Sequence, residues 1–322
     1  MLTLTRASLV LAVLALAPGH AAAQAYPTGP VRLVVPFPPG GTADPVARTV
    51  AQRLTQQLGQ QVVVDNRAGG STIIGTEIVA KAAPDGQTLL SAPFSFSANP
   101  SLFAKLPYDP MKDFVPITLL GATPIVLLVH PSFPARTVKE LIAMAKAKPG
   151  EINYGSAGNG TSNHLAAELF NQLAQVKLTN IPYKGAGPAT TALVSGEVFV
   201  GFPALPSAAP HIKNGRARAL AVASRTRARS MPNLPTMAEA GVPGCELEAW
   251  HGLMAPAGTP SAIITRLSSE TQKALQHPDV AKRFDAIGFE TGGGSPEEFA
   301  RFIQSETAKW ARVVKTAKIK VD

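Results

Sequence analysis

The stretch VRLVVPFPPGGTADP, residues 31–45, decides the fold class. Its first part, Val31–Phe37, is a continuous apolar run and predicts a buried strand. A proline and glycine loop follows, and then Asp44-Pro45, which is typical of a helix start with Asp44 as the N-cap. Apolar residues recur every four positions along that helix, at Val46, Val50, Leu54 and Leu58. A strand, a glycine loop and an amphipathic helix in this order predict an α/β fold.

The alternation of strands and helices continues beyond this stretch. Strands are expected at Gln61–Asp65 and Thr88–Ala92, with a helix over residues 72–82 between them. This order is typical of a parallel sheet with helices on its faces. Residues 99–116 are rich in proline and poorly periodic, so no element is predicted there.

A second series with the same plan begins at Ile152. A short strand, Ile152–Gly155, precedes the glycine loop Ser156–Thr161, and the next helix carries Leu165, Leu169 and Leu173 on one stripe. Further strands are expected at residues 125–130, 178–182, 198–202, 217–223 and 252–255. Further helices are expected at residues 138–148, 188–195, 205–214, 261–275, 279–286 and 296–315. Two series of one plan predict two domains that face each other across a cleft.

The first 25 residues have the three-part form of a secretory signal peptide. A basic end at Arg6 precedes the apolar run Ala7–Ala17, and Ala23-Gln24-Ala25 places cleavage before Tyr26. The run is shorter than the roughly 20 residues that a membrane-spanning helix needs. Export makes kinases and dehydrogenases poor candidates, because ATP and NAD are not maintained outside the cytoplasm.

Composition narrows the classes of function. Hydrophobic residues make up 45% of the chain and charged residues 16%, which excludes a disordered chain. A formal net charge of +9 favours an anionic partner, but the arginines between residues 216 and 229 fit a solvated basic face better than a nucleic-acid site. The lone Cys245 and the scattered histidines offer no metal-ligand spacing. We therefore expect no metal, no cofactor and no nucleic-acid partner.

The two glycine loops are the candidate binding sites. Ligands of open α/β sheets lie beyond the carboxyl ends of the strands, where both loops fall. Glycines let the backbone approach a ligand, and helix N-terminal amides favour anions. With Asp44 as the cap, free amides are expected at Gly40, Gly41 and Thr42. Hydroxyls and amides are also available from Ser156, Asn159, Thr161 and Asn163. A tight turn without a ligand is the alternative for each loop, and neither loop has the signature of a phosphate site.

The mature chain resembles the Bug-type receptors of tripartite tricarboxylate transporters. The motifs that carry the resemblance occur in order along the chain, at Pro36–Asp44, Val64–Arg67, Pro84–Gly86, Tyr154–His164, Pro182–Gly185, Leu234–Gly241 and Pro256–Pro260. The resemblance implies the type II periplasmic binding protein fold, with two α/β lobes joined by a hinge. Residues 26–125 and 247–322 would form lobe 1, and residues 126–246 would form lobe 2.

The resemblance also implies a function. It implies a monomeric periplasmic receptor, not an enzyme, that holds a small carboxylate through backbone amides and bridging waters rather than through an arginine clamp. A membrane permease of two subunits would be its partner. A sensory module of the same fold, feeding a membrane signalling protein, is the alternative.

The ligand class rests on the turn Phe202-Pro203-Ala204, which lacks the acid that can meet an ammonium group in amino-acid receptors of the family. We expect a ligand without positive charge: a dicarboxylate, an aromatic acid or a keto acid. Phe94 suggests an apolar ligand body, although core packing explains it equally well. Ser156 lacks the glycine of a nucleophile elbow, and His164 fits a capping or packing role better than that of a base. The candidate ligand-binding residues are Phe37, Pro39, Gly40, Gly41, Thr42, Asp44, Phe94, Ser95, Ser156, Gly158, Asn159, Gly160, Thr161, His164 and Pro203.

Overall fold

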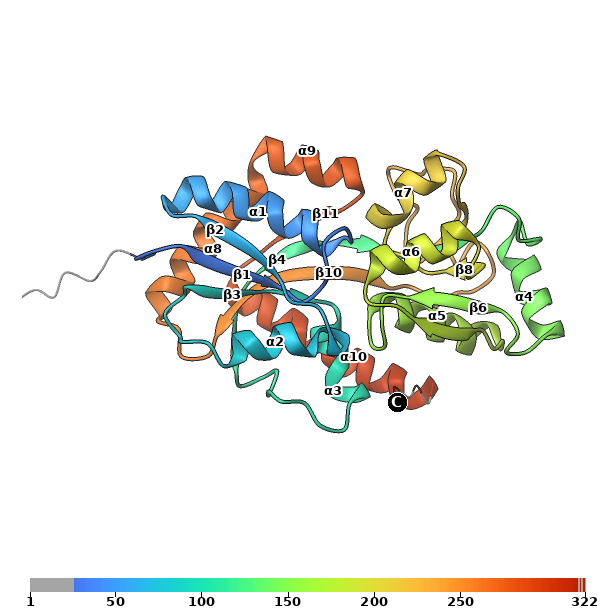
Figure 1. The fold of residues 1–322 in the computed structure, drawn as a ribbon, viewed down its shortest axis with the longest axis horizontal. Coiled ribbons are helices and arrows are strands. Elements are labelled where there is room, and N and C mark those ends of the chain that lie inside the picture. The colour runs from blue at the N-terminus through green and yellow to red at the C-terminus, as the bar shows by residue number, and fades with distance from the viewer. Residues whose placement is uncertain (1–25, 318, 320, 322) are drawn as a thin grey trace, which may run out of the picture.

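A computed structural model describes residues 26–317, 319 and 321. The predicted signal peptide lies outside these residues. Two sheets, each flanked by helices, lie side by side along the long axis of the molecule (Figure 1). The first sheet has six strands in the order β11-β4-β10-β3-β1-β2, and the second has five in the order β7-β6-β8-β5-β9.

The first sheet is mixed. Its strands are β1 (Val31–Val35), β2 (Val62–Asn66), β3 (Thr88–Pro93), β4 (Phe114–Pro124), β10 (Glu248–Pro256) and β11 (Glu290–Gly293). Strand β1 is parallel to β2 and β3, as predicted. Strand β10 is antiparallel to both of its neighbours, β3 and β4, and β11 is antiparallel to β4. The expectation of a purely parallel sheet is therefore wrong for this half of the sheet.

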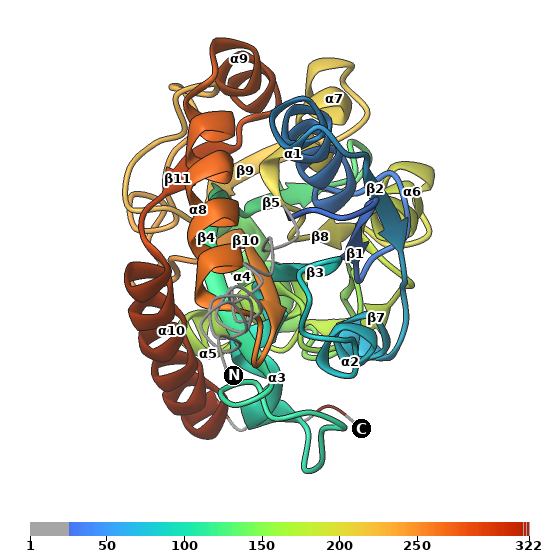
Figure 2. The same cartoon turned by 90° about the vertical axis from the view of Figure 1, so that its left-hand side faces the viewer.

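Helices cover both faces of the first sheet (Figure 2). They are α1 (Ala43–Leu58), α2 (Ile73–Ala80), α3 (Ser95–Leu102), α8 (Ser261–Gln276), α9 (Pro278–Ile287) and α10 (Pro296–Ala317). Alternate residues of β1 point to opposite faces. Leu33 belongs to the hydrophobic cluster of α1, α8 and α9, and Val34 to the cluster that contains Val79 of α2 and Phe299 of α10. Three of these helices thus cover each face.

The second sheet is also mixed. Its strands are β5 (Val126–Val129), β6 (Asn153–Ser156), β7 (Thr179–Pro182), β8 (Val200–Gly201) and β9 (Arg218–Val222). Strand β6 is parallel to β7 and β8, whereas β5 is antiparallel to β8 and β9. The helices of this half are α4 (Val138–Ala147), α5 (Ser162–Ala174), α6 (Ala186–Ser195) and α7 (Leu205–Lys213).

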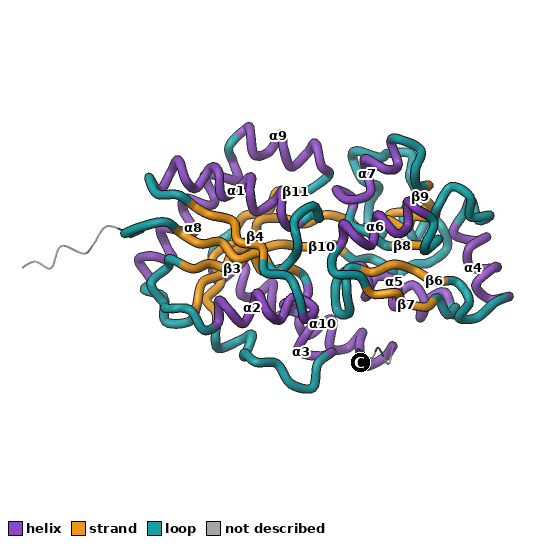
Figure 3. Tube along the Cα trace, in the orientation of Figure 1, coloured by secondary structure: helices purple, strands orange, loops and turns teal. Residues whose placement is uncertain are grey.

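The chain passes between the two halves beside β4 and β10, which Figure 3 shows running toward the second sheet. Ile125 joins β4 to β5, and its carbonyl accepts a hydrogen bond from the Ala223 amide at 2.7 Å. The Leu247 amide, just before β10, donates to the Ala223 carbonyl at 2.9 Å. The two crossings are thus held together by backbone hydrogen bonds.

Three elements were not predicted: α3, β4 and β11. Strand β4 lies between β10 and β11 in a sheet that helices cover on both faces, so its apolar residues do not alternate cleanly with polar ones. Helix α3 contains Pro100, which removes one backbone donor and hides the helical pattern.

The prediction that Asp44 caps α1 is wrong. The helix begins at Ala43, and Thr42 holds the N-cap position without a side-chain cap. The Asp44 carboxylate lies one turn from Arg48, whose Nε donates to it at 3.0 Å. The carboxylate thus pairs with an arginine one turn further along the helix and does not cap the helix end. Among the residues that the structure describes, no helix is both long and apolar enough to cross a bilayer.

Candidate functional site

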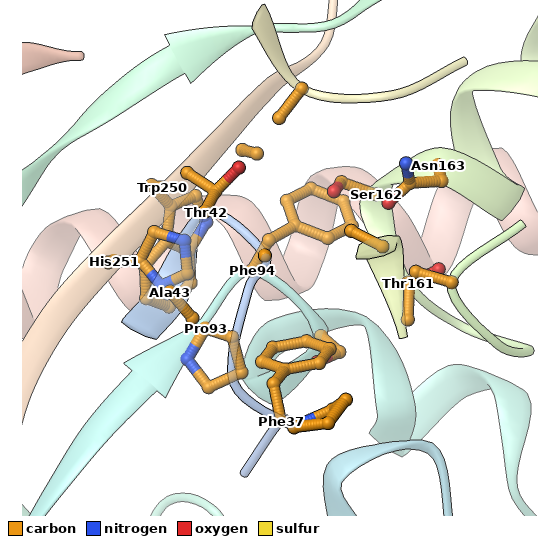
Figure 4. Close-up of a pocket in the computed structure, with 17 residues that line it drawn as sticks. Phe37, Thr42, Ala43, Pro93, Phe94, Thr161, Ser162, Asn163, Trp250 and His251 are labelled. Carbon is orange, nitrogen blue, oxygen red and sulfur yellow. The ribbon is translucent and has the colours of Figure 1, made fainter. Parts of the chain in front are cut away.

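A cavity lies between the two halves of the molecule and is lined by residues of both (Figure 4). The space between its lining atoms amounts to about 510 Å³, which includes solvent that is open to the outside. From the half with the first sheet come Phe37, Pro38, Gly41, Thr42, Ala43, Pro93, Phe94, Ser95, Ala249, Trp250 and His251. From the half with the second sheet come Ala157, Thr161, Ser162, Asn163, Ala186 and Ala204.

Helix N-termini converge on this cavity. The lining includes the first residues of α1, α3, α5 and α6, and Ala204, which directly precedes α7. The first intrahelical donor of α5 is the Leu165 amide, which bonds the Thr161 carbonyl at 3.0 Å; in α1 it is the Val46 amide. The amides before these donors have no carbonyl within their own helix. Such amides, at the positive end of a helix dipole, favour an anion.

Fixed charges are missing from the lining. None of its described residues is Lys, Arg, Asp or Glu. His251 is the titratable member; it is 5% exposed, and burial lowers its pKa to about 4, so the imidazole is neutral at pH 7. Across the described part of the chain, no group of three or more metal-ligating side chains forms. An anion held here would be bound by neutral dipoles.

Aromatic side chains form the middle of the cavity. Phe94 lies edge-on to Trp310 with ring centroids 4.9 Å apart, and Trp250 packs against Phe299 at 5.9 Å. Figure 4 shows Phe94 between Thr42 on one side and Asn163 on the other. The cavity thus has two polar ends and an apolar centre, which suits a short hydrocarbon chain with an acid at each end.

The two halves touch beside the cavity. The hydroxyl oxygens of Thr42 and of Ser207 in α7 are 3.2 Å apart. A Cβ on Gly41 would come within 3.4 Å of the Ala186 Cβ. The first loop thus lies against the start of α6 at Gly41, at the distance of an ordinary van der Waals contact.

The second glycine loop is held by its own hydrogen bonds. Thr161 Oγ1 donates to the Gly158 carbonyl at 2.7 Å, and the Gly160 amide donates to His164 Nδ1 at 3.2 Å. Burial lowers the pKa of His164 to about 4, so this imidazole can accept that bond at pH 7. Asn159 Oδ1 accepts from the Asn180 side chain at 2.9 Å. These contacts fix the start of α5, whose first residues line the cavity.

The predicted site residues divide into two groups. Those in the lining are Phe37, Gly41, Thr42, Phe94, Ser95 and Thr161. Those outside it are Pro39, Gly40, Asp44, Ser156, Gly158, Asn159, Gly160, His164 and Pro203. Of the second group, Pro39 and Gly40 are exposed at the tip of the first loop, and the Pro203 carbonyl accepts from the Val126 amide at 2.8 Å.

Sequence reasoning missed the contribution of β10. Ala249, Trp250 and His251 line the cavity from the part of this strand that precedes the predicted run 252–255. They come next to α1 through the pairing of His251 with Pro93 of β3. No local signal announces this approach, because the partners are more than 150 residues apart.

Comparisons with known proteins place the chain among solute receptors. The family described as "Tripartite tricarboxylate transporter family receptor" matches residues 46–319. Protein BugT of Bordetella pertussis is 39% identical over 98% of both chains. The structure of Rpa4515 of R. palustris with adipate has a TM-score of 0.89 and 39% identity, covering 92% of this chain and 99% of that one. MatC of Rhodopseudomonas palustris with bound malate has a TM-score of 0.86 and 35% identity, covering 90% and 100%. These likenesses confirm the predicted two-lobe fold.

Proposed function

The chain belongs to the tripartite tricarboxylate transporter receptor family, and from that premise we propose that it captures a small dicarboxylate between its lobes and delivers it to a membrane permease. Receptors of this family bind their ligands and are not enzymes. We assign lobe 1 to residues 26–125 and 247–322, and lobe 2 to residues 126–246, with the hinge at the two crossings. The signal peptide, cleaved between Ala25 and Tyr26, would send a monomer to the periplasm, where a two-subunit permease would receive the ligand.

The observation that carries the proposal is the pair of helix N-termini at opposite ends of one uncharged cavity. One carboxylate would meet the amides at Thr42 and Ala43 of α1, and the other those at Ser162 and Asn163 of α5. The aromatic middle would receive the hydrocarbon spacer. Adipate and malate, the ligands in two similar structures, both have this form.

Helix ends alone do not supply the affinity. Each contributes up to about 2 kcal/mol when partly buried, whereas micromolar binding needs about 8 kcal/mol. The remainder would come from burial of the spacer against Phe94 and from the contacts between the lobes. Ligand capture and lobe closure are therefore one event, because the lining is complete only when both lobes contribute to it.

Two measurements test this function. Native mass spectrometry of protein purified from the periplasm without refolding should show a co-purified small acid. Titration calorimetry with adipate, malate and aspartate should show binding of at least one of the first two and much weaker binding of aspartate, because the described lining offers no carboxylate to an ammonium group. Tight binding of aspartate with no binding of either adipate or malate would contradict the proposal.

A further inference from the structure

Two cavity residues, Trp250 and His251, have a buried side-chain nitrogen without a hydrogen-bond partner among the described residues, and His251 is the titratable one. It is 5% exposed, and its Nδ1 atom has no hydrogen-bond partner among the described residues. A buried polar atom that is left unpaired is costly, so such atoms usually have a structural or functional reason. The imidazole has room to turn toward another partner, because His251 lines the cavity.

The other buried histidine shows the contrast. His164 is 4% exposed and has a similarly lowered pKa of about 4, but its Nδ1 accepts a hydrogen bond from the Gly160 amide. It also lies outside the cavity lining. His164 is thus satisfied within its loop, whereas His251 has an unpaired nitrogen at a site that we expect to hold an anion.

No fixed charge faces His251 from the elements packed against it. Strands β3 and β4 contribute no titratable residue. Strand β10 itself carries Glu248, and β11, which begins after Phe289, carries Glu290, but neither changes the pKa of His251. Helix α2 carries Glu77, which is paired with Lys81, and α1 carries Asp44, which is paired with Arg48. The Phe289 ring, with its centroid 6.0 Å from that of the imidazole, is apolar. Desolvation alone accounts for the lowered pKa of His251.

We propose that His251 hydrogen-bonds the ligand carboxylate at the α1 end of the cavity and takes up one proton from solvent as the ligand binds. The inference rests on the proposed function and adds the uptake of one proton to the equilibrium for ligand binding. The proton goes to the unpaired imidazole nitrogen, the imidazolium donates to the carboxylate, and no other bond forms or breaks. His251 thereby selects for a ligand with an anionic group at that end.

A bound dicarboxylate would be a buried dianion. Closure transfers two carboxylates into a cavity that has dipoles but no cation. A negative charge next to His251 favours its protonated form and raises its pKa, which burial had lowered in the free protein. By linkage, the affinity for the dianion then increases as the pH falls.

The test is calorimetry with adipate and malate at pH 6, in buffers with different heats of ionisation, on the wild type and on His251→Gln. If the bound pKa returns to the ordinary histidine value, the wild type takes up about 0.7 proton more per ligand than the variant. Its dissociation constant then falls about fourfold from pH 8 to pH 6 beyond the change in the variant. His130→Gln is the control, since His130 is not buried and bonds Ser132 outside the cavity; it should take up protons like the wild type.

The possible outcomes separate a failure of this inference from a failure of the proposed function. Binding of a dicarboxylate with equal proton uptake in the wild type and in His251→Gln overturns this inference and leaves the proposed function intact. Failure of both dicarboxylates to bind the wild type contradicts the proposed function, and the inference fails with it. If His251→Gln does not fold, nitrogen NMR of the wild-type imidazole replaces it: the ring should change from neutral to protonated when ligand is added at pH 6, and a ring that stays neutral refutes the inference.

Discussion

The two glycine loops have similar sequences and different environments. The first, before α1, has its tip at Pro39 and Gly40 exposed and reaches across the cleft through Thr42 to Ser207. The second, before α5, is mostly buried and bonded to itself through Thr161 and His164. The first loop thus hydrogen-bonds the other half of the molecule, whereas the hydrogen bonds that hold the second loop are its own. Similar sequence patterns therefore lie in different environments. We call the first loop, before α1, the latch and the second loop, before α5, the cradle.

The largest expected effect tests the cradle. Gly160 has φ 75°, and a Cβ there would lie 2.8 Å from Asn99 Oδ1 and 3.0 Å from Leu102, both in α3. Gly160→Asp should weaken dicarboxylate binding by about 100-fold or more, on the order of 3 kcal/mol, because the new side chain obstructs closure and adds a negative charge. Calorimetry measures the affinity, and circular dichroism should still show one cooperative melting transition.

Gly59→Asp is the matched control for this substitution. Gly59 has a similar φ of 71°, but no atom lies within 4 Å of its added Cβ. The variant should lose a similar amount of stability from backbone strain and keep its affinity. An unchanged affinity in Gly160→Asp would show that the second loop does not control the site.

The next largest effect is a pH dependence of the free energy of unfolding that comes from His164 in the cradle. His164 has a pKa lowered to about 4 in the folded protein, so between pH 6.5 and pH 4 the unfolded chain binds more protons than the native one. The free energy of unfolding should therefore fall as the pH falls, by about 2 kcal/mol from this residue at pH 5. Urea unfolding at pH 7 and pH 5 measures it. His164→Asn keeps an acceptor for the Gly160 amide and should remove this part of the loss in unfolding free energy. An equal loss in the variant and the wild type would show that the cradle is not sensitive to acid.

The smallest effect concerns the latch. Thr42→Ala and Ser207→Ala, made singly and together, should show a coupling energy of about 0.5–1 kcal/mol in ligand affinity, because their hydrogen bond forms only on closure. Thr49→Ala replaces Thr42→Ala in the control cycle, since its hydroxyl bonds the Pro45 carbonyl within α1. Strict additivity of the Thr42 and Ser207 variants would show that the first loop does not work as a latch.

Local patterns predicted most of this architecture. The run Val31–Phe37 and the helix that follows it were predicted to within about two residues at most ends, because strand burial and helical spacing are local properties. Strand β4 was not predicted, because burial on both faces of the sheet removes the alternation that signals a strand. The long-range placement of β10 likewise has no counterpart in the local sequence.

The candidate site was predicted in outline. Both glycine loops were singled out, and Thr42 and Thr161 do line the cavity. The pattern of glycines does not show which side of a loop faces the cavity, so Ser156 and Asn159, which lie outside the lining, were grouped with Thr42 and Thr161. His251 was missed, because its position depends on a strand pairing of distant segments.

The central place of β10 in the first sheet also orders events in time. Strand β10 separates β3 from β4, and its residues 248–256 come more than 120 residues after the end of β4. Strands β3 and β4 therefore cannot be joined through β10 until the chain beyond residue 247 is available, whereas the strands of the second sheet all lie between residues 126 and 222. Contacts between such distant segments are slow to form. The half of the protein that contains its first described residues therefore cannot complete its sheet until nearly the whole chain is available.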